Sequence, residues 1–324
     1  MRHRVFSFVI LVLIACACIA TQAQTPEAAV NYFKDGLKKS DQGDYDGAIE
    51  AFSRAIALSS RLDKGKHSSS RNPASSFAGS NVPSAAEVLD DNVTVIDPFT
   101  ADAYNNRGFA RYRKADYLGA IEDFNAALRI RPALVVALLN RAAALQANGD
   151  SESAMKDLDK AIAIKKDFYQ AYINRGSLYH DLGHDKEALV DLNRAIELKN
   201  DVAEAFYQRG YVQLGLNNWD ESVNDFNRAI ELSPKMAWAY QGRGTVFMKK
   251  GQMERAIKDF TVAIDNSPEL VWAYFNRGLA QLYLGQEELA QRDFDMCLKL
   301  KPEVKKELED RIGLARHLRN SRKD

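Results

Sequence analysis

The chain has 324 residues, of which 46% are hydrophobic and 27% charged, a composition typical of a folded soluble protein. Its 44 basic and 44 acidic residues balance, so the formal net charge is zero. Because proteins that bind nucleic acid usually carry a clear excess of basic residues, this balance argues against DNA or RNA as a partner.

Residues 1–23 have the three parts of an export signal peptide. Positive charge in MRHR is followed by the apolar run VFSFVILVLIACACIA and then by small residues at Thr21 and Ala23. The apolar run is shorter than the roughly 20 residues that a membrane-spanning helix needs. We therefore expect an exported protein, located in the periplasm or outside the cell.

Two processing routes are open for this segment. Cleavage after Ala23 would release a soluble protein that begins at Gln24. The alternative is that LIAC, which ends at Cys16, acts as a bacterial lipobox; Cys16 would then be acylated and would anchor a lipoprotein to a membrane. Cleavage after Ala23 is favoured because Ile14 is tolerated rather than preferred at its position of a lipobox.

A motif around an Arg-Gly pair recurs every 34 residues, as in WAYQGRG at Trp238 and WAYFNRG at Trp272. A fixed period of this length is typical of solenoid proteins, in which each unit packs on its neighbours. Aligned on the motif, the chain divides into seven units, at residues 29–62, 101–134, 135–168, 169–202, 203–236, 237–270 and 271–304.

Each unit shows two helical patterns separated by a short turn. In the unit 101–134 we expect helices at 101–114 and 118–130, separated by the turn ADY. Glycine stands in the turn of five units, which suits the end of a helix. The second residue after this helix is proline in four units (Pro132, Pro234, Pro268 and Pro302), and Lys166 or Asn200 in two others.

Residues 63–100 interrupt the repeats between the first and second units. This segment is rich in Ser, Asn, Gly and Pro, a composition that cannot bury enough apolar surface to fold alone. We expect an inserted mobile loop. The alternative is that its short apolar stretch VTVI folds back onto the repeats and covers part of them.

Small residues and bulky residues recur in register in all the units. The first helices share Gly36, Gly108, Ala142, Gly176, Gly210, Gly244 and Gly278, and the second helices share Phe52, Phe124, Leu158, Leu192, Phe226, Phe260 and Phe294. In most units an alanine stands four residues before the bulky residue and another three residues after it, as in Ala120, Phe124 and Ala127. This pattern resembles the tetratricopeptide repeat. The resemblance implies an all-α fold, a right-handed superhelical solenoid of antiparallel helix pairs, with a concave groove that binds a protein or peptide. Residues 305–324 would be the capping helix and tail that such arrays need for solubility.

Arginine and aspartate recur as regularly as the small residues. The arginines are Arg107, Arg141, Arg175, Arg209, Arg243 and Arg277, and the aspartates are Asp123, Asp157, Asp191, Asp225, Asp259 and Asp293. At 100° per residue, the arginine position lies about 150° from the centre of the face that lines the groove of this family. We therefore expect an Arg–Asp ladder that ties helices together, rather than a row that binds phosphate or carboxylate groups.

The resemblance also points to residues that would line the groove. Asn106, Asn140, Asn174 and Asn276 resemble the asparagine ladder of the tetratricopeptide region of O-linked N-acetylglucosamine transferases, which holds a peptide by its backbone. The ladder is interrupted at Gln208 and lost at Gly242. The expected apolar anchors are Tyr207, Tyr211, Trp238, Trp272, Phe275 and Leu279. For the two tryptophans the alternative is burial against the second helix of the preceding repeat.

No residue pattern indicates catalysis, a metal or a cofactor. His180 and His184 are four residues apart, but Gly183 lies in the expected turn between them and HDLGH is not a zinc-peptidase motif. Cys297 replaces an alanine of the repeat pattern, which indicates a small buried thiol. The sequence thus predicts a non-enzymatic scaffold that binds an extended segment of a partner protein. The alternative is a structural protein of the cell envelope that assembles with copies of itself.

Overall fold

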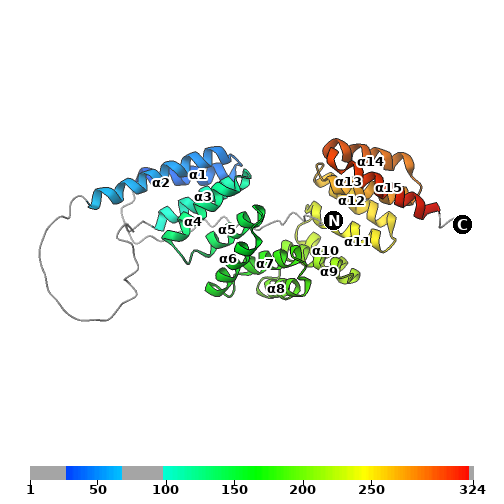
Figure 1. The fold of residues 1–324 in the computed structure, drawn as a ribbon, viewed down its shortest axis with the longest axis horizontal. Helices are drawn as coiled ribbons and strands as arrows, with labels where there is room; N and C mark the ends of the chain where they lie inside the picture. The colour runs from blue at the N-terminus through cyan, green and yellow to red at the C-terminus, as the bar shows by residue number, and fades with distance from the viewer. Residues whose placement is uncertain (1–26, 68–97, 321–324) are drawn as a thin grey trace, which may run out of the picture. The chain divides into compact units, whose positions relative to one another are not determined.

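The computed structural model describes residues 27–67 and 98–320, which are helical and contain no strand in those ranges. They form two compact units, one of residues 27–166 and one of residues 167–320. Each unit is a row of helical hairpins, in which a first helix packs against the second helix that follows it (Figure 1). The expected all-α solenoid of antiparallel helix pairs is therefore confirmed within each unit. None of the helices in the described ranges combines the length and apolar character that a membrane crossing requires.

The helices keep the 34-residue register along the chain. The first helices are α1 (Glu27–Asp41), α3 (Pro98–Arg113), α5 (Val135–Ala147), α7 (Tyr169–Asp181), α9 (Ala203–Gly215), α11 (Ala237–Lys249) and α13 (Val271–Tyr283). The second helices are α2 (Tyr45–His67), α4 (Tyr117–Ile130), α6 (Ser151–Ile164), α8 (Asp185–Leu198), α10 (Trp219–Leu232), α12 (Met253–Asn266) and α14 (Glu287–Leu300). A 3₁₀ turn, η1 (Pro302–Val304), and α15 (Lys305–Asn320) follow.

The turn between the two helices of a hairpin contains one residue in the left-handed backbone region. Glycine takes this position in five hairpins, with φ between 73° and 89°. The other two hairpins place Ala115 there with φ 61° and Asn217 with φ 62°. A side chain is unfavourable in this region, least so for asparagine, so Ala115 holds the most strained backbone of the seven turns.

The recurring glycine of the first helix and the bulky residue of the second helix meet face to face. A Cβ atom placed on Gly278 would lie 2.5 Å from Cε1 of Phe294, and one on Gly244 would lie 2.8 Å from Cε1 of Phe260. Real Cβ atoms do not come this close, so the two helices can approach only because the side chain is missing. This contact offsets the roughly 1 kcal/mol that glycine costs inside a helix.

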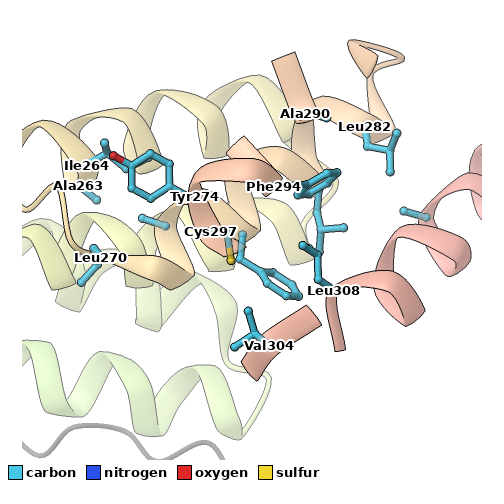
Figure 2. Packing of buried hydrophobic residues seen from close by; sticks show 14 of the residues in the cluster. Ala263, Ile264, Leu270, Tyr274, Leu282, Ala290, Phe294, Cys297, Val304 and Leu308 are labelled. Carbon is cyan, nitrogen blue, oxygen red and sulfur yellow. The ribbon is translucent and has the colours of Figure 1, made fainter. Parts of the chain in front are cut away.

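The last hairpin is covered at its C-terminal end. Figure 2 shows Val304 and Leu308, from η1 and α15, in the same buried cluster as Phe294 and Cys297 of α14. Residues 305–320 thus bury apolar side chains of the final repeat, as expected of a capping helix. Residues 321–324, the end of the expected capping helix and tail, lie outside the described residues.

Two boundaries differ from those expected. Helix α2 continues to His67 and α3 begins at Pro98, so both ends of the segment 63–100 are helical rather than loop. No proline occurs between Tyr45 and His67 to stop α2, and a proline at the first position of a helix loses no hydrogen bond. The remaining residues of the segment, including VTVI, lie outside the described residues, as do the signal peptide 1–23 and Cys16.

Proline is not required to end the second helix. α6 ends at Ile164 and α8 at Leu198, in the same register as α4, although Lys166 and Asn200 stand where α4 is followed by Pro132. The boundary is therefore set by the packing period rather than by proline.

Candidate functional site

Consecutive first helices contact one another within each unit, whereas consecutive second helices make no comparable contact among the described residues. In residues 167–320 these contacts join α7 to α9, α9 to α11 and α11 to α13. The first helices are thus closer together than the second helices, so they line the concave side of the unit. We call this side, formed by α7, α9, α11 and α13, the inner face.

The four asparagines of the expected ladder do not have equal hydrogen-bonding freedom. In residues 27–166, Asn106 Nδ2 donates to the backbone oxygen of Asp102 over 2.8 Å and Asn140 Nδ2 donates to Asn105 Oδ1 over 3.1 Å. Asn140 Oδ1 is buried and has no partner among the described residues.

In residues 167–320, Asn174 is buried with its Nδ2 unpartnered among the described residues, and Asn276 is half-buried. Asn140 and Asn174 therefore keep one unused amide group each, an acceptor and a donor. The loss of the ladder at Gly242 has a steric cause, because a Cβ there would lie 2.4 Å from Cζ of Phe226.

Three of the six expected apolar anchors are largely buried. Tyr207 is 2% exposed, Phe275 3% and Leu279 6%, so they present little surface to a ligand. Tyr211 is half-buried, and its ring meets those of Tyr207 and Phe226 edge-on, with centroids 5.1 and 5.2 Å apart. These residues form the apolar floor of the inner face rather than projecting from it.

The two tryptophans are half-buried at the same position of consecutive repeats. Trp238 packs against the cluster that contains Tyr207 and Phe226 and also against the cluster that contains Phe275. Its contact with the cluster of Phe226 matches the alternative of burial against the preceding repeat's second helix. Trp272 packs against the second cluster, and its ring centroid lies 5.3 Å from that of Phe275. Each ring thus contributes to packing and keeps part of its surface accessible.

Glu204 is a member of the inner face that the sequence pattern did not single out. It stands 34 residues before Trp238, so the repeat period places a carboxyl group where the next two repeats have tryptophan. Glu204 is 7% exposed, and Gln208 Nε2 donates to its Oε1 over 2.6 Å. Burial raises the pKa of Glu204 to about 8, which keeps the carboxyl group protonated at neutral pH.

Amide and phenol groups continue this polar cluster along α9 and α11. The Tyr211 hydroxyl interacts with Tyr207 and Gln241, and burial raises the pKa of Tyr211 to about 12. Gln241 is 8% exposed, and its Oε1 has no hydrogen-bond partner among the described residues. Gln241 is thus linked to Glu204 through Tyr211 and Tyr207, and it adds a second buried acceptor.

The recurring arginines bind the buried aspartates, as expected. In every pair, Arg Nε and Nη2 donate to the two carboxylate oxygens of the aspartate 16 residues later, which lies on the second helix of the same repeat. The pairs are Arg107–Asp123, Arg141–Asp157, Arg175–Asp191, Arg209–Asp225, Arg243–Asp259 and Arg277–Asp293. Each of these guanidinium groups makes a two-bond contact with an aspartate, so the Arg–Asp ladder is confirmed.

A third contact of these arginines was not expected. Nη1 of Arg209 donates to Asn193 Oδ1 over 2.7 Å, and Nη1 of Arg277 donates to Thr261 Oγ1 over 3.0 Å. Both acceptors lie on the second helix of the preceding repeat, directly after its bulky residue. The arginine therefore joins two repeats as well as two helices, and the recurring polar residue at that position (Asn, Ser, Thr or Asp) was the sequence signal for it.

The remaining candidates show structural contacts. His180 Nδ1 lies 2.6 Å from Asp185 Oδ1, and His184 lies beyond the end of α7, so the two histidines are not on one helix. No group of His, Cys, Asp and Glu that could hold a metal ion occurs in the described ranges. Cys297 is buried in the last hairpin, and burial raises the pKa of its thiol to about 11.

Three family models match the repeats. One described as a TPR repeat matches residues 176–217, and two described as tetratricopeptide repeats match residues 207–270 and residues 101–134, 135–168 and 273–304. The chain has no significant match among curated proteins.

Solved structures with low sequence identity share the fold. A tetratricopeptide repeat protein from Parabacteroides merdae ATCC 43184 is 21% identical, with a TM-score of 0.62 over 89% of this chain and 99% of that chain. PilF from Pseudomonas aeruginosa is 17% identical, with a TM-score of 0.55 over 62% of this chain and 92% of that chain. A thermophilic TPR protein from Thermus thermophilus is 19% identical, with a TM-score of 0.51 over 56% of this chain and 99% of that chain.

Proposed function

The chain belongs to the tetratricopeptide repeat family, and on that basis we propose that it is a non-enzymatic scaffold that binds an extended segment of a partner protein. The fold supports protein interaction, since arrays of this kind offer extended concave surfaces for binding. In this proposal, the side chains of the first helices contact the bound segment.

The observation that carries this proposal is the set of buried amide groups without partners. Asn140 offers an unused acceptor in residues 27–166, and Asn174 offers an unused donor on the inner face of residues 167–320. Buried polar groups in folded proteins are nearly always hydrogen-bonded, so unused ones on the first helices favour a ligand that supplies the missing partner. The backbone of an extended chain supplies donors and acceptors in alternation, whatever its sequence.

A random library of displayed 12-residue peptides, selected on the full chain, tests this proposal. Peptides that bind should lose affinity on Asn174→Ala, because the amide that contacts their backbone is removed. Asn200→Ala is the matched control, since Asn200 lies in an exposed loop of the same repeat and should leave affinity unchanged. Selection of no peptide, or equal loss with both variants, would contradict the proposal.

Self-association is the second candidate function. Leu314 and Leu318 are 49% and 40% exposed, and they lie four residues apart on one side of α15, where another copy could pack. Size-exclusion chromatography with light scattering separates the two candidates. A monomer at all concentrations supports the scaffold, and a mass that rises with concentration and falls with Leu314→Glu supports self-association.

A further inference from the structure

The buried carboxyl group of Glu204 is paired only with a neutral side chain. Among the described residues it has no ion pair, and its hydrogen bond is with the neutral amide of Gln208. The other buried carboxylates of the repeats, such as Asp225 and Asp259, each receive two hydrogen bonds from an arginine. Burial of a carboxylate without a cation is unfavourable, which is why Glu204 keeps its proton. A carboxyl group with a perturbed pKa on a candidate binding face is a candidate functional group.

The surroundings of Glu204 combine acceptors with aromatic rings. Tyr207 and Tyr211 lie one and two helical turns further along α9, and Gln241 on α11 adds an acceptor without a partner. Trp238, on α11, packs against the apolar cluster to which Tyr207 belongs. No charged group on the helices packed against α9, which are α7, α8, α10 and α11, shifts the pKa of Glu204.

This chemistry is complementary to a cation that carries several N–H donors. A guanidinium or ammonium group carries donors of the kind that the oxygens of Glu204 and Gln241 accept, and the faces of tyrosine and tryptophan rings attract a positive charge. A neutral donor would satisfy Gln241 and leave Glu204 protonated. An acidic group would be repelled once Glu204 ionises.

We propose that Glu204, Gln241, Tyr211 and Trp238 form a subsite that takes one basic side chain, Arg or Lys, of the segment bound on the inner face. This subsite rests on the proposed function, because the side chain arrives as part of a bound segment. It gives the scaffold selectivity that backbone contacts with asparagine cannot supply.

A proton balance follows from the subsite. The free protein holds the proton of Glu204 at pH 7, because burial disfavours the carboxylate. A bound cation favours the carboxylate, so the proton passes to solvent when the basic side chain enters. Binding should therefore release close to one proton per segment at pH 7, and affinity should rise with pH up to about pH 8.

The peptides selected on the full chain provide the probe. We expect them to share a basic residue at one position, and replacement of that residue by glutamine should weaken binding about tenfold or more, a typical effect for one side of a desolvated charge pair. On Glu204→Gln, which keeps the size and hydrogen-bonding capacity of the side chain, the same replacement in the peptide should change affinity less than about twofold. Glu254→Gln is the control, because Glu254 is an exposed carboxylate on α12 and should behave as the unmodified chain does.

Calorimetry of the same peptide in two buffers of different ionisation enthalpy measures the proton. Release of about one proton by the unmodified chain and by Glu254→Gln, and of none by Glu204→Gln, supports the subsite. Circular dichroism of Glu204→Gln checks that the variant keeps its helices.

The outcomes separate the subsite from the proposed function. Peptides that bind through Asn174 but share no basic position would overturn the subsite and leave the scaffold intact. A basic position whose effect is the same on Glu204→Gln would place the cation elsewhere and also overturn it. Failure of every peptide to bind would contradict the proposed function, and the subsite with it.

Discussion

Arg243 donates two hydrogen bonds to the buried carboxylate of Asp259, from Nε to Oδ2 and from Nη2 to Oδ1, both over 2.8 Å. Its Nη1 donates to Asn227 Oδ1 of the preceding repeat over 2.6 Å, and its guanidinium carbon lies 5.6 Å from the centroid of the Tyr240 ring. One side chain thus joins α11, α12 and α10. Such a planar fork of donors is available to arginine and not to lysine.

Arg243→Ala should lower the free energy of unfolding by about 3 kcal/mol, because it leaves Asp259 buried without a counter-charge. Urea unfolding followed by circular dichroism measures the effect. Lys156→Ala is the control, because Lys156 and Glu152 form an ion pair in which both side chains are more than 70% exposed. Its loss should lower the free energy of unfolding by less than about 0.5 kcal/mol. Equal effects of the two substitutions would show that the Arg–Asp pair adds nothing beyond a surface ion pair.

Ala115→Gly should raise the free energy of unfolding by about 0.5 kcal/mol. Ala115 has φ 61°, where a side chain costs about 1–2 kcal/mol, and the greater freedom of glycine in the unfolded chain cancels part of the gain. The reverse change Gly149→Ala, at the same turn position with φ 89°, should destabilise by a similar amount. No atom lies within 4 Å of a Cβ on Gly149, so a loss there reports backbone strain and not a steric clash. Stabilisation by both substitutions would rule out this account.

Glu204 should make stability depend on pH. Its pKa is about 8 in the folded chain against 4.5 for an unperturbed glutamate, so between these values the folded state holds a proton that the unfolded state has lost. Because the folded state binds more protons, the free energy of unfolding falls as the pH rises through this window, by at most about 1.4 kcal/mol per pH unit.

The comparison that isolates this effect uses Glu204→Gln at pH 5, 6, 7 and 8. The variant should gain stability relative to the unmodified chain as the pH rises, whereas Glu254→Gln should show no such trend. If the difference in free energy of unfolding between Glu204→Gln and the unmodified chain is the same at every pH, Glu204 titrates in the folded protein near its ordinary pKa.

The sequence was sufficient to predict the helices and their register, because both depend on spacings that can be counted. Gly244 and Phe260, 16 residues apart, meet in the fold as the same positions do in other repeats, and the arginine position faces the aspartates. These contacts lie within one hairpin, so one repeat unit contains all the residues that make them.

The inner face could be predicted less well, because its burial depends on neighbouring repeats. Tyr207 and Phe275 occupy groove positions of the family pattern, yet side chains of the adjacent helices cover them to within 3% of complete burial. Glu204 was missed for the same reason, since a glutamate in the first turn of a helix is ordinary unless its surroundings are known. Whether a side chain at a groove position is accessible depends on two or three neighbouring repeats together.

The N-terminal segment provides a prediction that rests on sequence alone. The mature protein isolated from its native host should begin at Gln24, or else at an acylated Cys16, because the charged, apolar and small-residue parts of an export signal are all present. Mass spectrometry of the mature N-terminus distinguishes the two routes. Cys16→Ala should leave the mass unchanged after cleavage at Ala23 and should abolish anchoring if Cys16 is acylated. An intact Met1 would contradict both routes.

Trp238 and Trp272 should both contribute to binding, but they should differ in their effect on folding. Each is half-buried on the inner face, and loss of an aromatic anchor typically costs about 2 kcal/mol of binding free energy, or roughly a thirtyfold loss of affinity. Trp238 packs against two buried clusters and Trp272 against one. Trp238→Ala should therefore also lower the free energy of unfolding, by about 2 kcal/mol, and Trp272→Ala by less.

Trp219 is the matched control for these two substitutions. It is also half-buried and packs against the cluster of Tyr207 and Phe226, but it begins the second helix α10 and does not belong to the inner face. Trp219→Ala should destabilise the chain while leaving the affinity for selected peptides unchanged, as measured by titration well below the unfolding temperature. If Trp219→Ala weakens peptide binding as much as Trp238→Ala does, the loss comes from general destabilisation of the repeats, and the two inner-face tryptophans are not anchors.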